Sequence, residues 1–284
     1  MPENSNPLNK YFRQPAVFVT LPSGGNYPPH ILTPSQTGEL GVQPMTARDE
    51  IIFKTPDALM NGQGMVDVIQ SCIPAVKDAW QICNYDLDSI LIAIRIATYG
   101  ETMDINFTVP GTTEQISHTL NLPSLLDQIK STTVKNEVVL KDGLKIAVRP
   151  LTYKDMTATA LQTFTQQKLY STVQSAEMAP EEKVKRFNES FKALTELSHT
   201  ILLKNISKII TSEGAEVTDP VQIKEFVEKA NAVLIKELQD KLIELRTQGA
   251  VRPVKLKATE EQIKKGAPAS YEIPVTFDTA NFFV

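Results

Sequence analysis

Cysteine and histidine are scarce in this chain. Among 284 residues only Cys72 and Cys83 are cysteines. Two cysteines are too few for a disulfide scaffold and, by themselves, too few for a structural zinc site. Both stand in apolar stretches, so we expect them to be buried thiols in a reducing compartment.

Recognisable catalytic motifs are also absent. His30, His118 and His199 are the only histidines, and none belongs to a local cluster of metal ligands. Neither GxSxG nor HExxH occurs. The neighbouring acidic pairs, Asp49 with Glu50 and Asp86 with Asp88, are better explained by helix caps and turns than by acid-base catalysis. We therefore expect a non-enzymatic protein with no cofactor and no metal.

The sequence has no excess of positive charge and no long hydrophobic run. It carries 29 Lys and Arg against 33 Asp and Glu, a net charge of -4. A nucleic-acid binder would usually show a basic face. The basic clusters at 183–186 and 264–266 are typical of solvated surfaces. The first ten residues have neither a basic start nor a short apolar run, so we expect no secretion signal. We expect neither nucleic acid nor a membrane as partner.

The most apolar stretch is predicted to be a central, buried helix at 88–99. Seven of the eight residues from Ile90 to Ala97 are apolar, so a helix there has no face for solvent. Asp88 and Gly100 suit its two ends. Its length of about 18 Å is too short for a bilayer, and a buried strand is the alternative. The exception, Arg95, requires an anion: either a structural ion pair, for which Asp49 and Glu50 are candidates, or a partner's carboxylate.

Residues 1–36 are predicted to form an extended, proline-rich arm with one strand at 16–21. Gly24 and Gly25 follow that strand, but no Gly-Lys-Ser/Thr follows them, which argues against a phosphate loop. A glycine turn that lets the arm lie against a neighbour is the better explanation. The candidate contact residues in this turn are Pro22, Gly24, Gly25 and Tyr27.

The rest of the chain indicates an α+β fold: a compact helical core with two small β-hairpins and a long antiparallel helical extension. We assign the α+β core to 37–151, the long helices to 152–249, and a returning strand and tail to 250–284. Within the core we expect two short strands at 39–54, a helix from Thr55 to Pro74, and a short helix at 75–83. At Gly62 and Gly64 the longer helix either breaks or lies close to another backbone. The hairpins are expected at 103–121 and 137–151, the second with an Asp-Gly turn.

Within 152–249 we expect helices from Thr152 to about Gln174, at 181–212 and at 220–249, whose apolar faces contact one another or a partner helix. Self-association through these helices is one outcome of that pattern. The chain ends in Asn281, Phe282 and Phe283, and we expect the two phenylalanines either to dock on the hairpins or to insert into a partner.

Several stretches resemble one family. LPSGGNY, TGELGVQPMTARDEIIFKTPDALMNG, SCIP and AIRIATYGETMDI are similar to the baseplate proteins of T-even-type contractile-tailed bacteriophages, which are baseplate hub subunits or hub assembly proteins. The resemblance covers about 21–129 and, with IPVTFDTANFF, 271–283. Many members of the family carry two cysteine pairs in a zinc-ribbon arrangement, whereas this chain has NFTVPGTTEQ and KKGAPASYE at those places. We expect the two segments to meet through packing instead of metal.

The resemblance implies a role in building the tail. The protein would help the baseplate hub form around the tape-measure and central spike proteins, in the host cytoplasm during assembly or within the tail baseplate of the virion. A dedicated tail assembly chaperone that is absent from the virion is the alternative. A tail-associated hydrolase is a remote alternative, because the chain lacks a catalytic constellation.

Overall fold

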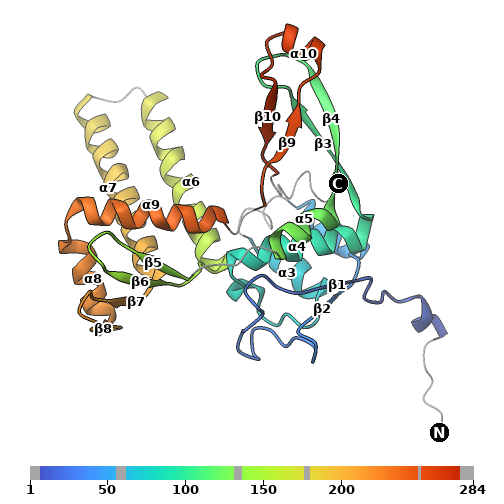
Figure 1. Cartoon of the computed structure of the whole chain (residues 1–284), viewed down its shortest axis with the longest axis horizontal. Helices are drawn as coiled ribbons and strands as arrows, with labels where there is room; N and C mark the ends of the chain where they lie inside the picture. The colour runs from blue at the N-terminus through green and yellow to red at the C-terminus, as the bar shows by residue number, and fades with distance from the viewer. Residues whose placement is uncertain (1–6, 56–61, 131–135, 176–179, 249–250, 276–284) are drawn as a thin grey trace. The chain divides into compact units, whose positions relative to one another are not determined.

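The computed structural model describes residues 7–55, 62–130, 136–175, 180–248 and 251–275. The fold is α+β, with helices and small antiparallel sheets of two to four strands (Figure 1). The chain divides into two compact units. Unit 1 comprises residues 1–79, 86–132 and 250–284, and unit 2 comprises 80–85 and 133–249.

Unit 1 begins with a 3-10 turn, Pro7–Tyr11, and a short antiparallel pair of strands, β1 (Val17–Val19) and β2 (Leu40–Val42). The strand expected after β2 is wrong, because helix α1 (Ala47–Phe53) follows instead. Its first turn is fixed by a capping box in which Thr46 and Asp49 satisfy each other's backbone N–H groups.

Helix α3 (Gln63–Cys72) starts directly after Gly62, whose φ of 79° places it in the left-handed region that favours glycine. The helix therefore does not run through Gly62, and α3 begins immediately after it. Residues 56–61, where the helix from Thr55 was expected to begin, lie outside the described parts of the chain. The short helix expected at 75–83 is reduced to one 3-10 turn, η2 (Ala79–Gln81).

The central helix predicted from the sequence is α4 (Asn84–Tyr99). All residues from Ile90 to Ile94 are buried on every side of this helix, which confirms that it has no solvent face there. It begins one turn earlier than expected. It ends as predicted, since Gly100 has a φ of 95° and donates its N–H to Ile96 O.

Two hairpin-like pairs complete unit 1. β3 (Thr102–Thr108) pairs with β4 (Gln115–Asn121) as predicted, and α5 (Leu122–Lys130) follows. Near the C-terminus, β9 (Val254–Lys257) and β10 (Ser270–Ile273) form a second antiparallel pair, with the short helix α10 (Glu260–Lys264) between them.

Unit 2 contains a four-stranded antiparallel sheet in the order β5 (Glu137–Val139), β6 (Lys145–Val148), β7 (Ile206–Ile210), β8 (Glu216–Val217). The hairpin with the Asp-Gly turn is confirmed as β5 and β6, and Gly143 has a φ of 87°. The sheet packs with α8 (Pro220–Lys229) and α9 (Ala232–Gln248) around buried residues such as Ile146, Ile209, Val227 and Leu238.

Two helix predictions in unit 2 are wrong. The helix expected at 181–212 ends at Asn205, because the β-branched stretch from Ile206 pairs with β6 as a strand. The single helix expected at 220–249 is broken into α8 and α9 at Ala230. Asn231 causes the new start, since its side chain accepts the N–H of Val233 as a cap.

Helices α6 (Tyr153–Ser175) and α7 (Pro180–Asn205) lie side by side in unit 2 (Figure 1). The capping box predicted at the start of α6 is present, with hydrogen bonds between Thr152 and Asp155. Lys204 at the end of α7 contacts Asp155 at the start of α6, with 2.6 Å between Nζ and Oδ1. The two helices are therefore antiparallel.

Candidate partner-contact sites

The glycine turn of the arm is bound to α4 of its own chain. The backbone N–H of Ser23 donates to Asp86 Oδ1 at 2.9 Å, and the Ser23 and Tyr27 hydroxyls both donate to Asp86 Oδ2 at 2.5 Å. Gly24 and Gly25 have φ values of 80° and 69°, which allows the chain to turn back toward this carboxylate. Asp86 is completely buried.

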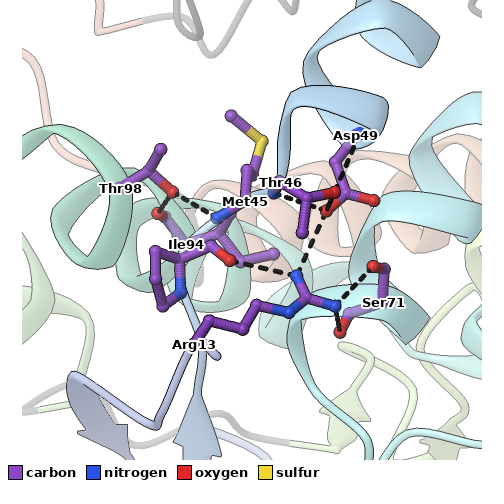
Figure 2. Close-up of polar contacts among 8 residues, drawn as sticks. Arg13, Met45, Thr46, Asp49, Ser71, Ile94 and Thr98 are labelled. Atoms are coloured by element: carbon purple, nitrogen blue, oxygen red, sulfur yellow. Dashed lines mark hydrogen bonds and ion pairs between the residues drawn. The ribbon is translucent and has the colours of Figure 1, made fainter. Parts of the chain in front are cut away.

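Arg13 fixes the preceding part of the arm (Figure 2). One guanidinium nitrogen donates to Pro44 O and to Asp49 Oδ2, and the other donates to both oxygens of Ser71 at 2.8 Å. Burial opposes ionisation of Asp49, but the hydrogen bonds from Thr46 and Ser71 and the charge of Arg13 keep its pKa below the usual value. The sequence analysis missed this network, although Thr46 and Asp49 show capping-box spacing.

Arg95 has neither of the expected carboxylate partners within the described structure. Its side chain stacks on the ring of Tyr99, with the guanidinium carbon 4.4 Å from the ring centroid. Nε and Nη1 are buried without a hydrogen-bond acceptor among the residues that the structure describes. Burial lowers the pKa of Arg95 from its ordinary value. Asp49, which we considered as a candidate anion, is paired with Arg13 instead.

The segments 106–115 and 264–272, which we expected to meet, are in contact. The loop after β3 and the loop after α10 touch so closely that a Cβ on Gly111 would lie 2.4 Å from Gly266 O. Glu114 accepts hydrogen bonds from Gln262 and Lys265, and the bond from Lys265 holds its pKa below the usual range. Below the contact lies a small apolar cluster of Val109, Ala267, Tyr271 and Ile273.

Within the described parts of the chain, no group of three or more His, Cys, Asp or Glu side chains is arranged to hold a metal ion. None of the helices in those parts has the length and apolarity needed to cross a bilayer. The candidate contact residues Asn281, Phe282 and Phe283 lie outside the described residues.

The α6/α7 pair exposes an apolar surface that the sequence analysis had assigned to contacts between helices. Phe164, Phe187 and Phe191 are 50%, 46% and 65% exposed. Between the helices lies a groove of about 800 Å³, with Leu169 from α6 and Val184, Phe187 and Ala193 from α7 in its lining. The two helices meet partly through polar groups, since Ser190 donates to Gln166 at 2.7 Å. Two helices alone do not bury these side chains.

The comparison with protein families decides the class of this protein. The model of the family described as T4 bacteriophage base plate protein matches residues 16–265. The chain belongs to this family. The match spans the glycine turn, α4, both long helices and the first part of the C-terminal segment, including β9 and α10. No curated protein and no solved structure matches the chain.

The protein is thus a phage baseplate protein of the T4 type. Membership indicates a structural or assembly role in the baseplate, other phage tail or baseplate proteins as partners, and association with the tail of the virion. The family is generally structural.

Proposed function

We propose that this protein acts without catalysis in assembly of the baseplate hub, as a hub subunit or as an assembly factor that contacts hub, tape-measure or central spike proteins. The observation that carries the proposal, beyond family membership, is the exposed apolar surface of α6 and α7. Exposed apolar side chains such as Leu169, Val184 and Phe187 in the lining of a groove are typical of a protein-protein contact.

We define the helical-pair face as Leu169, Val184, Phe187 and Phe191. A partner that covers this face needs an apolar stripe of helical spacing, because the groove runs between two antiparallel helices. At its rim Arg186 is paired with Glu182 at 3.1 Å, whereas Lys183 and Lys185 form no ion pair among the described residues. Acidic residues beside the partner's apolar stripe would complement these two lysines.

A dedicated chaperone is the second candidate function. The same face would then shield apolar helices of a tape-measure or hub protein until they assemble, and the protein would leave before the virion is complete. The exposed face supports both functions equally, so the two differ only in whether the complex persists.

Quantitative mass spectrometry of purified virions, combined with capture of the tagged protein from infected cells, separates the alternatives. A fixed ratio to other baseplate proteins in virions supports a subunit. Absence from virions together with capture of hub or tape-measure proteins supports a chaperone. Absence from virions and capture of no tail protein would refute both.

Phe187→Gln is the matched test of the helical-pair face, and Val221→Gln is its control. Val221 lies in α8 of the same unit and is also strongly exposed, but it is not part of the groove. We expect Phe187→Gln to reduce capture of the partner at least about tenfold and Val221→Gln to leave it unchanged. Equal capture by both variants would argue against this face.

A further inference from the structure

The Arg95 guanidinium is a buried cation whose hydrogen-bonding capacity is largely unused. The residue is 9% exposed, and Nε and Nη1 have no acceptor among the described residues. Donors that are buried without a partner destabilise the fold, and this cost is greater for a charged group. The third nitrogen, Nη2, is not among these buried atoms, so it is the accessible edge of the guanidinium.

Two neighbouring residues hold the guanidinium in place. The Tyr99 ring lies against its face, and the Tyr99 hydroxyl donates to Glu50 Oε1 at 3.1 Å. The ring is thereby fixed between α4 and α1, and it supports the cation from one side only. The stacking compensates part of the lost hydration but supplies no acceptor in the plane of the guanidinium, where its N–H groups point.

We propose that Arg95 is a receptor for a carboxylate that a partner protein supplies. The inference rests on the proposed function in so far as the partner is another baseplate protein. The ligand is the carboxylate of an Asp or Glu side chain, or of a chain terminus, that approaches the exposed edge of the guanidinium. Binding at Nη2 gives the buried charge its missing counter-ion.

A carboxylate suits this place better than a phosphate. Both are oxyanions that guanidinium groups bind well. Glu50 is held beside Tyr99, however, and a second negative group repels a dianion more strongly than a monoanion. The chain also carries a net charge of -4, which does not favour a highly charged anion.

The first test uses the isolated full-length chain and acetate as the probe. We compare thermal unfolding in sodium acetate and in sodium chloride at equal ionic strength, for the wild type, Arg95→Met and Arg48→Met. Arg48 is the control because it is an exposed arginine on α1 of the same unit. We expect acetate to raise the Tm of the wild type and of Arg48→Met relative to chloride, and to leave Arg95→Met unchanged. An equal shift in all three proteins overturns the proposal.

The Tm of Arg95→Met in chloride provides a second test. Replacement of an unpaired buried charge by an apolar side chain of similar size is neutral or stabilising. Arg95→Met should therefore keep the Tm of the wild type or raise it by up to about 4 °C. A purely structural arginine predicts the reverse, and a clear loss of Tm would overturn the proposal. Arg95→Lys keeps the charge without the guanidinium, and it replaces Arg95→Met in these measurements if that variant does not fold.

Capture of partners from infected cells completes the test. Arg95→Met should retain less than about one tenth of the baseplate protein that the wild type captures, despite its unchanged or higher Tm. Unchanged capture overturns the proposal. If the wild type itself captures no tail protein, the proposed function fails, whereas the acetate and Tm results still decide the role of Arg95.

Discussion

Substitution of Gly111 tests the contact between the β3–β4 loop and the loop after α10. Gly111 has a φ of 80°, and a Cβ there would lie 2.4 Å from Gly266 O, a backbone atom. The left-handed conformation costs an L-residue about 1–2 kcal/mol. Separation of the two backbones adds about 1–3 kcal/mol, as overpacking does in other well-packed places. A gain of about 0.4–1 kcal/mol from the less flexible unfolded chain offsets part of this.

We therefore expect Gly111→Ala to lower the free energy of unfolding of unit 1 by about 3 kcal/mol. Gly38→Ala is the matched control. Gly38 has a φ of 78° in the same unit, but nothing lies within 4 Å of the position that its Cβ would take. The control carries the conformational cost alone, and we expect it to lose about 1 kcal/mol.

Urea unfolding of the full chain, together with amide hydrogen exchange, measures both effects. In Gly111→Ala the amides of β9 and β10 should exchange faster, because the contact that holds this pair against the β3–β4 loop is lost. In the control they should exchange as in the wild type. Equal loss of stability in the two variants would refute the contact as a source of stability.

Three further substitutions test other parts of the account. Arg13→Met leaves the buried Asp49 carboxylate without its cation, so urea unfolding should show a loss of about 2–4 kcal/mol, part of which the added Asp49→Asn restores. Burial raises the pKa of Asp88 from 3.8 to about 6, so the native state holds this proton more tightly than the unfolded chain does. Stability should fall as pH rises from about 4 to about 6, and Asp88→Asn should remove this fall and exceed the wild type at pH 8 by up to about 3 kcal/mol. Phe191→Gln should change the stability of the isolated chain by less than about 0.5 kcal/mol, since this side chain is exposed; a larger loss would mean that α7 relies on it for folding.

Local signals in the sequence account for the elements that were predicted correctly. The uninterrupted apolar run from Ile90 identifies α4, because neither a surface helix nor an edge strand tolerates it. Apolar and polar residues alternate on each side of residues 111–114, which identifies the first hairpin. The Asp142-Gly143 turn identifies the second. In each case the deciding residues lie within about twenty positions of one another.

The wrong predictions depend on distant contacts or on competing local signals. Ile206 and Ile209 continue an apolar helical pattern, and only pairing with β6, some 60 positions earlier in the chain, makes them a strand. In α1 the β-branched Ile51 and Ile52 favoured a strand, whereas the Thr46–Asp49 capping box, also visible in the sequence, determines the outcome. Asn231 likewise signals a new helix start, but the apolar pattern runs through it.

The candidate contact sites were predicted only in part. The sequence identifies Arg95 as a charge in an apolar helix, but its lack of an acceptor depends on how the surrounding side chains pack. The exposure of Phe187 and Phe191 depends on the number of helices that pack together, which helical periodicity alone does not specify.

The most direct test of the central claim is site-specific photo-crosslinking during infection. A photoreactive amino acid in place of Phe187 lies at the groove between α6 and α7, and the same residue in place of Val221 serves as control. We predict that the first position crosslinks to another baseplate or tail protein, identified by mass spectrometry, and that the control does not. Crosslinks from neither position to a tail protein, or equal crosslinks from both, would contradict the assignment of this face to baseplate assembly.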